Sequence, residues 1–113
     1  MKPAILVTPA SLCSQPALLD GLRDMAEMTF SPQELPEDLG KFRIVILGNE
    51  VFGRRESERA PSLRLIVRYG VSVHRVSLEA AVERGVVVTR CPIVPANSVA
   101  EYTIAVMMYL CKG

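Results

Sequence analysis

Residues 63–89 read Leu63-Arg-Leu-Ile-Val-Arg-Tyr-Gly-Val-Ser-Val-His-Arg-Val-Ser-Leu-Glu-Ala-Ala-Val-Glu-Arg-Gly-Val-Val-Val-Thr89. The apolar runs at 63–68 and 85–89 each predict a strand. Between them, Ser77 stands at the N-cap position of a predicted helix, and Gly85 stands at the position that ends it. A strand, a helix and a strand in this order predict two parallel strands joined by a crossover helix.

The rest of the chain continues this alternation. Short apolar runs predict further strands, and stretches with helical spacing of apolar residues predict further helices. These elements are strands at 3–8, 28–30 and 42–47, and helices over 11–26, over 50–60 and from 98 to the C-terminus. The order predicts an α/β fold, in which helices cover both faces of a mostly parallel five-stranded sheet in a three-layer sandwich.

The composition favours a single domain with a net charge close to zero. The 113 residues are 50% hydrophobic, and 13 Lys and Arg against 12 Asp and Glu give a net charge of +1. A chain of this length buries roughly two-thirds of its unfolded surface, which suffices for one core. A net charge this small attracts neither nucleic acid nor an anionic membrane, so we expect no partner of either kind.

The sequence also favours a cytoplasmic location. The first ten residues lack the pattern of a signal peptide, and the apolar stretch 99–111 contains Glu101 and is shorter than the ~20 residues that span a bilayer. Cys13, Cys91 and Cys111 are odd in number and show no C-x-x-C spacing. Neither a disulfide framework nor a metal site is expected from them.

A turn at the end of a predicted strand is the best candidate for a binding site. Gly70-Val71-Ser72 follows the strand that ends at Arg68, and Gly48-Asn49 ends the neighbouring strand in the same way. Ligands of α/β proteins bind at such carboxyl ends, and consecutive backbone N–H groups can bind an anion there, with Arg68 adding charge. The residues alone support an ordinary strand-ending turn equally well. No G-x-G-x-x-G dinucleotide motif occurs in the chain.

Three motifs together resemble the D-isomer-specific 2-hydroxyacid dehydrogenases, of which phosphoglycerate-dehydrogenase-like enzymes are the nearest type. They are R-x-G-V at 68–71, L-E-A-A-x-x-R-G-V-x-V at 78–88, and Pro92 followed nine residues later by the Glu101 of V-A-E. The resemblance covers about residues 63–110. It implies that residues 1–96 form a flavodoxin-like substrate-binding domain and that 97–113 lead toward a nucleotide-binding domain.

The resemblance also implies the role of this chain. The family's catalytic Arg, Glu and His lie beyond the matched region, so we expect no catalytic or cofactor-binding residue here, NAD(H) only in the complete enzyme, and a chain that is inactive alone. The expected ligand is a small 2-hydroxy or 2-oxo carboxylate, bound by the backbone of Gly70, Val71 and Ser72 with help from Arg68 and Asn49. The alternative is a stand-alone, non-catalytic module that binds small anions or regulates.

The final predicted helix is apolar on nearly every side between residues 98 and 111. Such a helix requires burial all round, and an uncovered apolar patch drives association. We therefore expect a homo-oligomer formed through residues 98–111.

Overall fold

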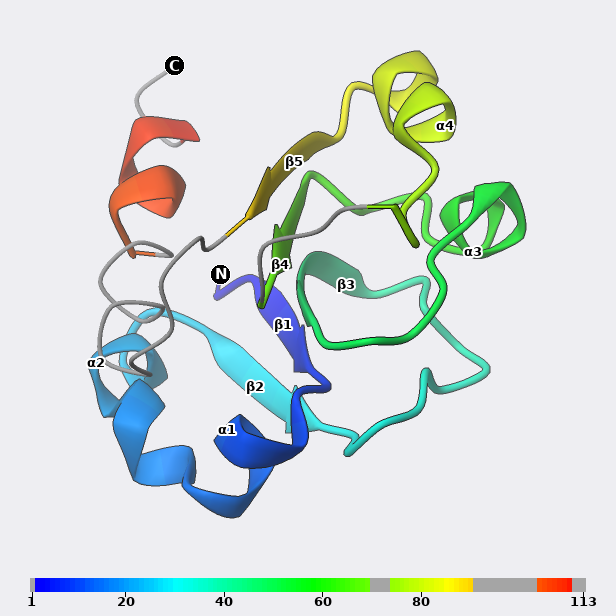
Figure 1. The fold of residues 1–113 in the computed structure, drawn as a ribbon. Coiled ribbons are helices and arrows are strands. Elements are labelled where there is room, and N and C mark those ends of the chain that lie inside the picture. The colour runs from blue at the N-terminus through cyan, green and yellow to red at the C-terminus, as the bar shows by residue number, and fades with distance from the viewer. Residues whose placement is uncertain (1, 70–73, 91–103, 111–113) are drawn as a thin grey trace.

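The computed structural model describes residues 2–69, 74–90 and 104–110. Five parallel strands form one sheet in the order β2-β1-β3-β4-β5 (Figure 1). The strands are β1 (Ala4–Val7), β2 (Glu27–Phe30), β3 (Phe42–Leu47), β4 (Leu65–Arg68) and β5 (Val87–Arg90). The helices are α1 (Ala10–Ser14), the 3-10 helix η1 (Pro16–Leu19), α2 (Asp20–Arg23), α3 (Arg54–Glu58) and α4 (Leu78–Arg84), and residues 104–110 are also helical. The predicted α/β class and five-stranded parallel sheet are confirmed.

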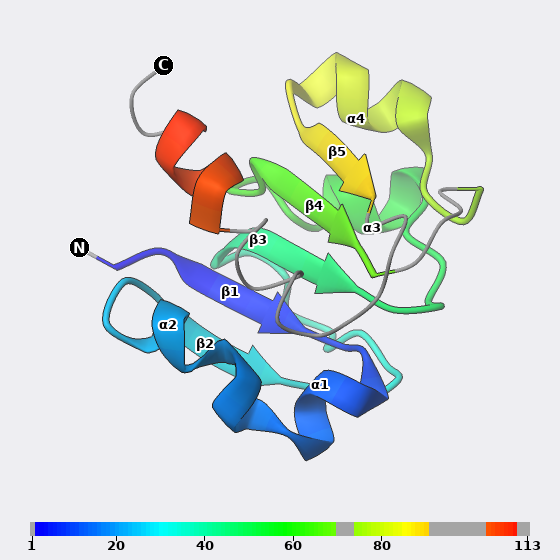
Figure 2. The same ribbon diagram turned by 60° about the vertical axis from the view of Figure 1, so that its left-hand side comes forward.

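The sheet separates two hydrophobic cores. Figure 2 shows the helices that lie on either side of it. One core packs under α1, η1, α2 and the helical residues 104–110, and the other under α3 and α4. Every residue of β4 is buried, and β3 exposes only Arg43. These two strands are therefore continuous apolar runs because they are covered on both faces.

Two predicted helices are wrong in extent. The helix expected over 11–26 is broken into α1, η1 and α2, and Pro16 begins the 3-10 turn because it cannot donate the backbone hydrogen bond that a continuing α-helix needs. The helix expected over 50–60 is reduced to α3. Phe52 instead forms an isolated parallel bridge with Val76, with Phe52 N donating to the Arg75 carbonyl at 2.8 Å.

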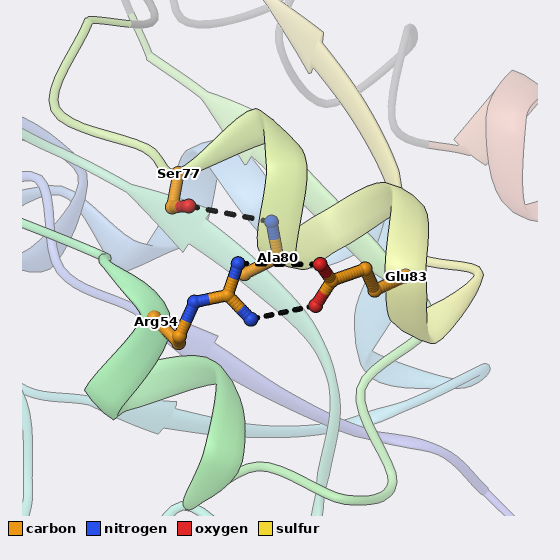
Figure 3. Close-up of polar contacts among 4 residues, drawn as sticks. All are labelled: Arg54, Ser77, Ala80 and Glu83. Carbon is orange, nitrogen blue, oxygen red and sulfur yellow. Dashed lines mark hydrogen bonds and ion pairs between the residues drawn. The ribbon is translucent and has the colours of Figure 1, made fainter.

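The predicted caps of α4 are confirmed. Ser77 Oγ accepts a hydrogen bond from Ala80 N at 3.3 Å, and Gly85 ends the helix with φ of 71°. Figure 3 shows this cap beside the ion pair of Arg54 and Glu83, which joins α3 to α4. The left-handed backbone at Gly85 explains why glycine stands there.

The helical residues 104–110 are covered on one side only. Met107 is buried in the core beneath α2, and Ile104, Val106 and Leu110 pack partly against it. Tyr109 is 76% exposed, and Met108 is about half exposed. The start of the predicted helix, including its proposed capping box at 98–101, lies outside the described residues. Within the described part of the chain, no helix is long and apolar enough to cross a membrane.

Candidate functional site

The candidate site lies where the order of strands reverses. The chain runs from β1 outward to β2, then crosses back to β3 on the other side of β1 and continues to β4 and β5. Ligands of open α/β sheets bind at the carboxyl ends of the strands beside such a reversal. A pocket of about 430 Å³ opens at this point. Its lining consists of Thr8, Pro9, Ala10, Ser11, Gln33, Gly48, Asn49, Glu50 and Tyr69.

A hydrogen-bonded cluster forms the β1 side of the pocket. Thr8 is fully buried, and its hydroxyl oxygen accepts from Gly48 N at 2.9 Å. The same hydroxyl donates to Oε1 of Glu50 in a short contact, and Gly48 N lies 3.2 Å from that carboxylate oxygen. The turn after β3 is thus held to the end of β1 through one buried hydroxyl and one carboxylate.

Gly48 is required by the close approach of its neighbours. A Cβ atom at this position would lie 3.2 Å and 3.4 Å from the two carboxylate oxygens of Glu50 and 3.3 Å from the backbone Cα of Pro9. Such distances are tighter than ordinary van der Waals contacts, so a larger residue would push the turn away from β1.

A buried arginine forms the β4 side of the site. Arg68 is only 7% exposed, and its Nη2 donates to Oδ1 of Asn49 at 2.9 Å. Its Nη1 donates to the carbonyl of Tyr69 in a short contact, whereas its Nε has no hydrogen-bond partner among the described residues. Both partners line the pocket, so the guanidinium lies directly behind the pocket wall. A buried cation with an unused donor favours an anionic ligand nearby.

The structure brings together two of the predicted site residues. Arg68 and Asn49 are in direct contact, and the register pairs Leu47 of β3 with Arg68 of β4, so the two strand ends share one edge as predicted. The predicted binding turn Gly70, Val71 and Ser72 lies outside the described residues. Its role stays a prediction.

Sequence reasoning missed most of the pocket. Thr8 and Glu50 are joined across 42 positions of the chain, and no local pattern reports such a contact. The sequence predicts that a helix begins at Glu50, whereas Glu50 lies in the turn after β3. Gln33 has a φ of 59°, and its N–H donates to the Thr8 carbonyl at 3.0 Å, which places it at the pocket rim. One signal was available, since Thr8 is the polar residue that directly follows β1.

Two further reactive side chains, Cys13 and His74, fall among the described residues. Partial burial raises the pKa of the Cys13 thiol, a Ser31 backbone hydrogen bond opposes this, and the charge of Glu50 reinforces it. A thiol with a raised pKa is a poor nucleophile at neutral pH. His74 is exposed. Among the described residues, no group of three or more His, Cys, Asp or Glu side chains could hold a metal ion.

Comparison with known proteins gives the family. Residues 5–108 match the model of the D-isomer specific 2-hydroxyacid dehydrogenase catalytic domain. The chain therefore belongs to the D-isomer specific 2-hydroxyacid dehydrogenase family. The predicted resemblance is confirmed and extends to β1 and β3, well beyond the motifs that first suggested it.

Two curated relatives and one solved structure illustrate the match. The chain is 31% identical over 110 residues to a glyoxylate reductase of Thermococcus gammatolerans, covering 90% of this chain and 32% of that protein. It is 30% identical over 90 residues to a D-3-phosphoglycerate dehydrogenase of Archaeoglobus fulgidus, covering 79% and 17% respectively. An NAD⁺-bound 3-phosphoglycerate dehydrogenase of Entamoeba histolytica shares the fold, with a TM-score of 0.69 at 15% identity over 80% of this chain and 33% of that one. The chain thus spans a third or less of the length of each.

Proposed function

We propose that this chain is the substrate-binding domain of an NAD-dependent oxidoreductase that acts on the CH–OH group of a 2-hydroxy acid. The main supporting observation is the buried Arg68, which contacts Asn49 behind a pocket at the reversal of strand order and whose Nε has no partner in residues 2–69, 74–90 and 104–110. Family membership supplies the type of reaction, and the pocket supplies a place for the substrate.

In this proposal, the carboxylate of a 2-hydroxy or 2-oxo acid binds at the end of β4. The backbone N–H groups of Gly70, Val71 and Ser72 donate to it, because consecutive N–H groups in a turn form a concave anion site. Arg68 adds a fixed positive charge, and Asn49 holds the guanidinium in place.

The cofactor belongs to the complete enzyme rather than to these residues. In the complete enzyme this cofactor, NAD(H), would supply or accept the hydride. The present sequence has no G-x-G-x-x-G motif that would hold its pyrophosphate, so its residues do not fit that group. We accordingly propose that residues 1–96 bind and orient the substrate, that 97–113 lead toward the nucleotide-binding part, and that the chain alone is inactive. A cytoplasmic setting belongs to the same proposal and rests on the cysteine pattern.

A homo-oligomer formed through residues 98–111 is also proposed. Support comes from the exposed Met108 and Tyr109 on a helix whose opposite side is already packed. Light scattering across a dilution series tests it with wild type and a Met108→Lys, Tyr109→Lys variant. We expect association that the variant abolishes, and a wild type that stays monomeric at high concentration would contradict it.

Binding of glycolate followed by amide chemical shifts tests the main proposal. We expect saturable shifts at residues 48–50 and 68–74, and loss of these shifts in Arg68→Met, which removes the charge but keeps the bulk. NADH added at the same concentration should leave the spectrum unchanged. Shifts that are absent at both strand ends would overturn the substrate-site proposal, and saturable NADH binding would overturn the division of roles.

A further inference from the structure

Glu50 is the charged side chain among the described residues that line the pocket, and Arg68 lies behind two of them, Asn49 and Tyr69, rather than in the lining itself. β3 lies between β1 and β4 in the sheet. Arg68, on the β4 side, contacts Asn49 and the Tyr69 carbonyl, whereas Glu50 contacts Thr8 and Gly48 on the β1 side. A ligand that spans the pocket with its carboxylate near Arg68 therefore directs its remaining group toward the Glu50 carboxylate.

The Glu50 carboxylate is fixed in place. Its Oε1 accepts from the Thr8 hydroxyl and from Gly48 N, and Thr8 is itself fully buried. Both hydrogen bonds fall on Oε1, which leaves Oε2 able to accept from a hydroxyl group of a ligand. The close packing of Gly48 against both carboxylate oxygens prevents the side chain from approaching that turn any further.

No described residue lining the pocket carries a positive charge to offset Glu50. The other side chains of the lining are neutral, including Ser11, Gln33 and Tyr69. The undescribed segments 70–73 and 91–103 contain no Lys, Arg or His in their sequence. A phosphate or second carboxylate that enters this side of the pocket would therefore meet the like charge of Glu50, and such a contact is unfavourable.

We infer that this pocket selects short 2-hydroxy or 2-oxo monocarboxylates whose remaining group is neutral and able to donate a hydrogen bond, and that Glu50 excludes those carrying a phosphate or a second carboxylate. This inference rests on the proposed function and narrows its substrate class. The known relatives of the chain include proteins described as glyoxylate reductase and as D-3-phosphoglycerate dehydrogenase. The charge of the pocket favours the unphosphorylated class of ligand.

Paired titrations of the 113-residue chain with glycerate and 3-phosphoglycerate test this inference. Amide shifts are followed at residues 48–50 at constant ionic strength, so that general screening is the same for both ligands. In wild type we expect glycerate to bind about tenfold more tightly than 3-phosphoglycerate. The variant Glu50→Gln keeps an oxygen for Thr8 and Gly48 but removes the charge, and it should reduce the preference to about threefold or less.

Glu58→Gln on α3 is the matched control, since it changes the net charge equally at an exposed site that does not line the pocket. It should keep the wild-type preference. Equal or tighter binding of 3-phosphoglycerate by wild type would overturn the inference and leave the proposed function standing. A preference that Glu58→Gln abolishes as fully as Glu50→Gln would also overturn it. Absence of shifts with either ligand would instead overturn the proposed function.

Discussion

Arg54 and Arg68 each donate two hydrogen bonds through the two terminal nitrogens of the guanidinium, but one arginine is exposed and the other is buried. Arg54 is exposed and binds both carboxylate oxygens of Glu83, at 2.6 Å and 3.3 Å (Figure 3). Arg68 is buried, and within the described part of the chain it bonds to the side-chain oxygen of Asn49 and to a backbone carbonyl, while its Nε has no partner there. The exposed arginine thus has the fully charged partner, and the buried one has neutral partners.

This difference in burial and in the charge of the partners distinguishes an arginine that contacts another helix from an arginine suited to bind a ligand. An exposed ion pair adds little because water and salt screen it. Burying a charge costs desolvation free energy, and hydrogen bonds to neutral partners offset that cost only in part. Arg68 is therefore poorly explained as a stabilising residue, whereas a nearby anionic ligand would complete its environment. The pocket beside it is the natural position for that anion.

Replacing Arg68 should give the largest effect and separates its two roles. Arg68→Ala leaves a cavity and unpaired oxygens on Asn49 and at the Tyr69 carbonyl, so we expect a loss of about 2–4 kcal/mol in the free energy of unfolding. Arg68→Met fills the space and removes the buried charge but leaves the same two oxygens unpaired, so we expect a smaller loss of about 1–2 kcal/mol. Urea denaturation measures both. A loss in Arg68→Met as large as in Arg68→Ala would mean that the guanidinium is mainly structural.

Gly48→Ala should give the next largest effect, because it tests the packing that holds the turn after β3. The new Cβ would crowd the Pro9 backbone and both oxygens of Glu50, and we expect a loss of about 1–3 kcal/mol by urea denaturation. Gly21→Ala is the matched control, since its Cβ would lie at an ordinary 3.5 Å from Ile104 Cδ1. That control should be neutral or gain about 0.5–1 kcal/mol from lower backbone entropy in a helix. Equal losses in both variants would show that Gly48 has no special role.

Thr8→Val tests the buried hydroxyl alone. The change keeps the shape of the side chain but removes the acceptor for Gly48 N and the donor to Glu50, so about 1–2 kcal/mol should be lost. Thr8→Ser retains the hydroxyl and should retain the hydrogen bonds, as judged by the amide shift of Gly48. An unchanged Gly48 amide shift in Thr8→Val would show that the hydroxyl does not hold the turn.

The elements that the sequence predicts correctly depend on local contacts, whereas the residues that it misses depend on contacts between distant parts of the chain. The strands at 42–47 and 65–68 follow from apolar runs, and the caps Ser77 and Gly85 follow from local backbone chemistry. Arg68 was found because it directly precedes a strand-ending turn. Glu50 was not, because its position depends on Thr8, which is remote in the sequence. Local patterns report elements, whereas a pocket is assembled from the ends of several elements.

The exposed pair of Arg54 and Glu83 should give the smallest effect, and that effect should depend on pH. The hydrogen bond and the charge of Arg54 hold the pKa of the Glu83 carboxyl below its usual value. A carboxyl whose folded-state pKa is depressed binds its proton less readily than the unfolded chain does. Its contribution to stability is therefore complete above the unfolded pKa of ~4.3, and it is lost as the pH falls through the lower folded-state value.

Unfolding of wild type and Glu83→Gln at pH 7 and pH 3 measures this contribution. We expect a small difference at pH 7 that shrinks at pH 3 and in high salt, because protonation and screening both remove the attraction. Glu27→Gln, at the exposed start of β2, is the control for the general effect of removing one negative charge. A difference for Glu83→Gln that is insensitive to pH and salt would mean that the contact acts through packing between α3 and α4. In that case the ion pair of Arg54 would contribute no electrostatic stabilisation. The comparison of the two arginines would then depend only on the burial of Arg68 and its neutral partners.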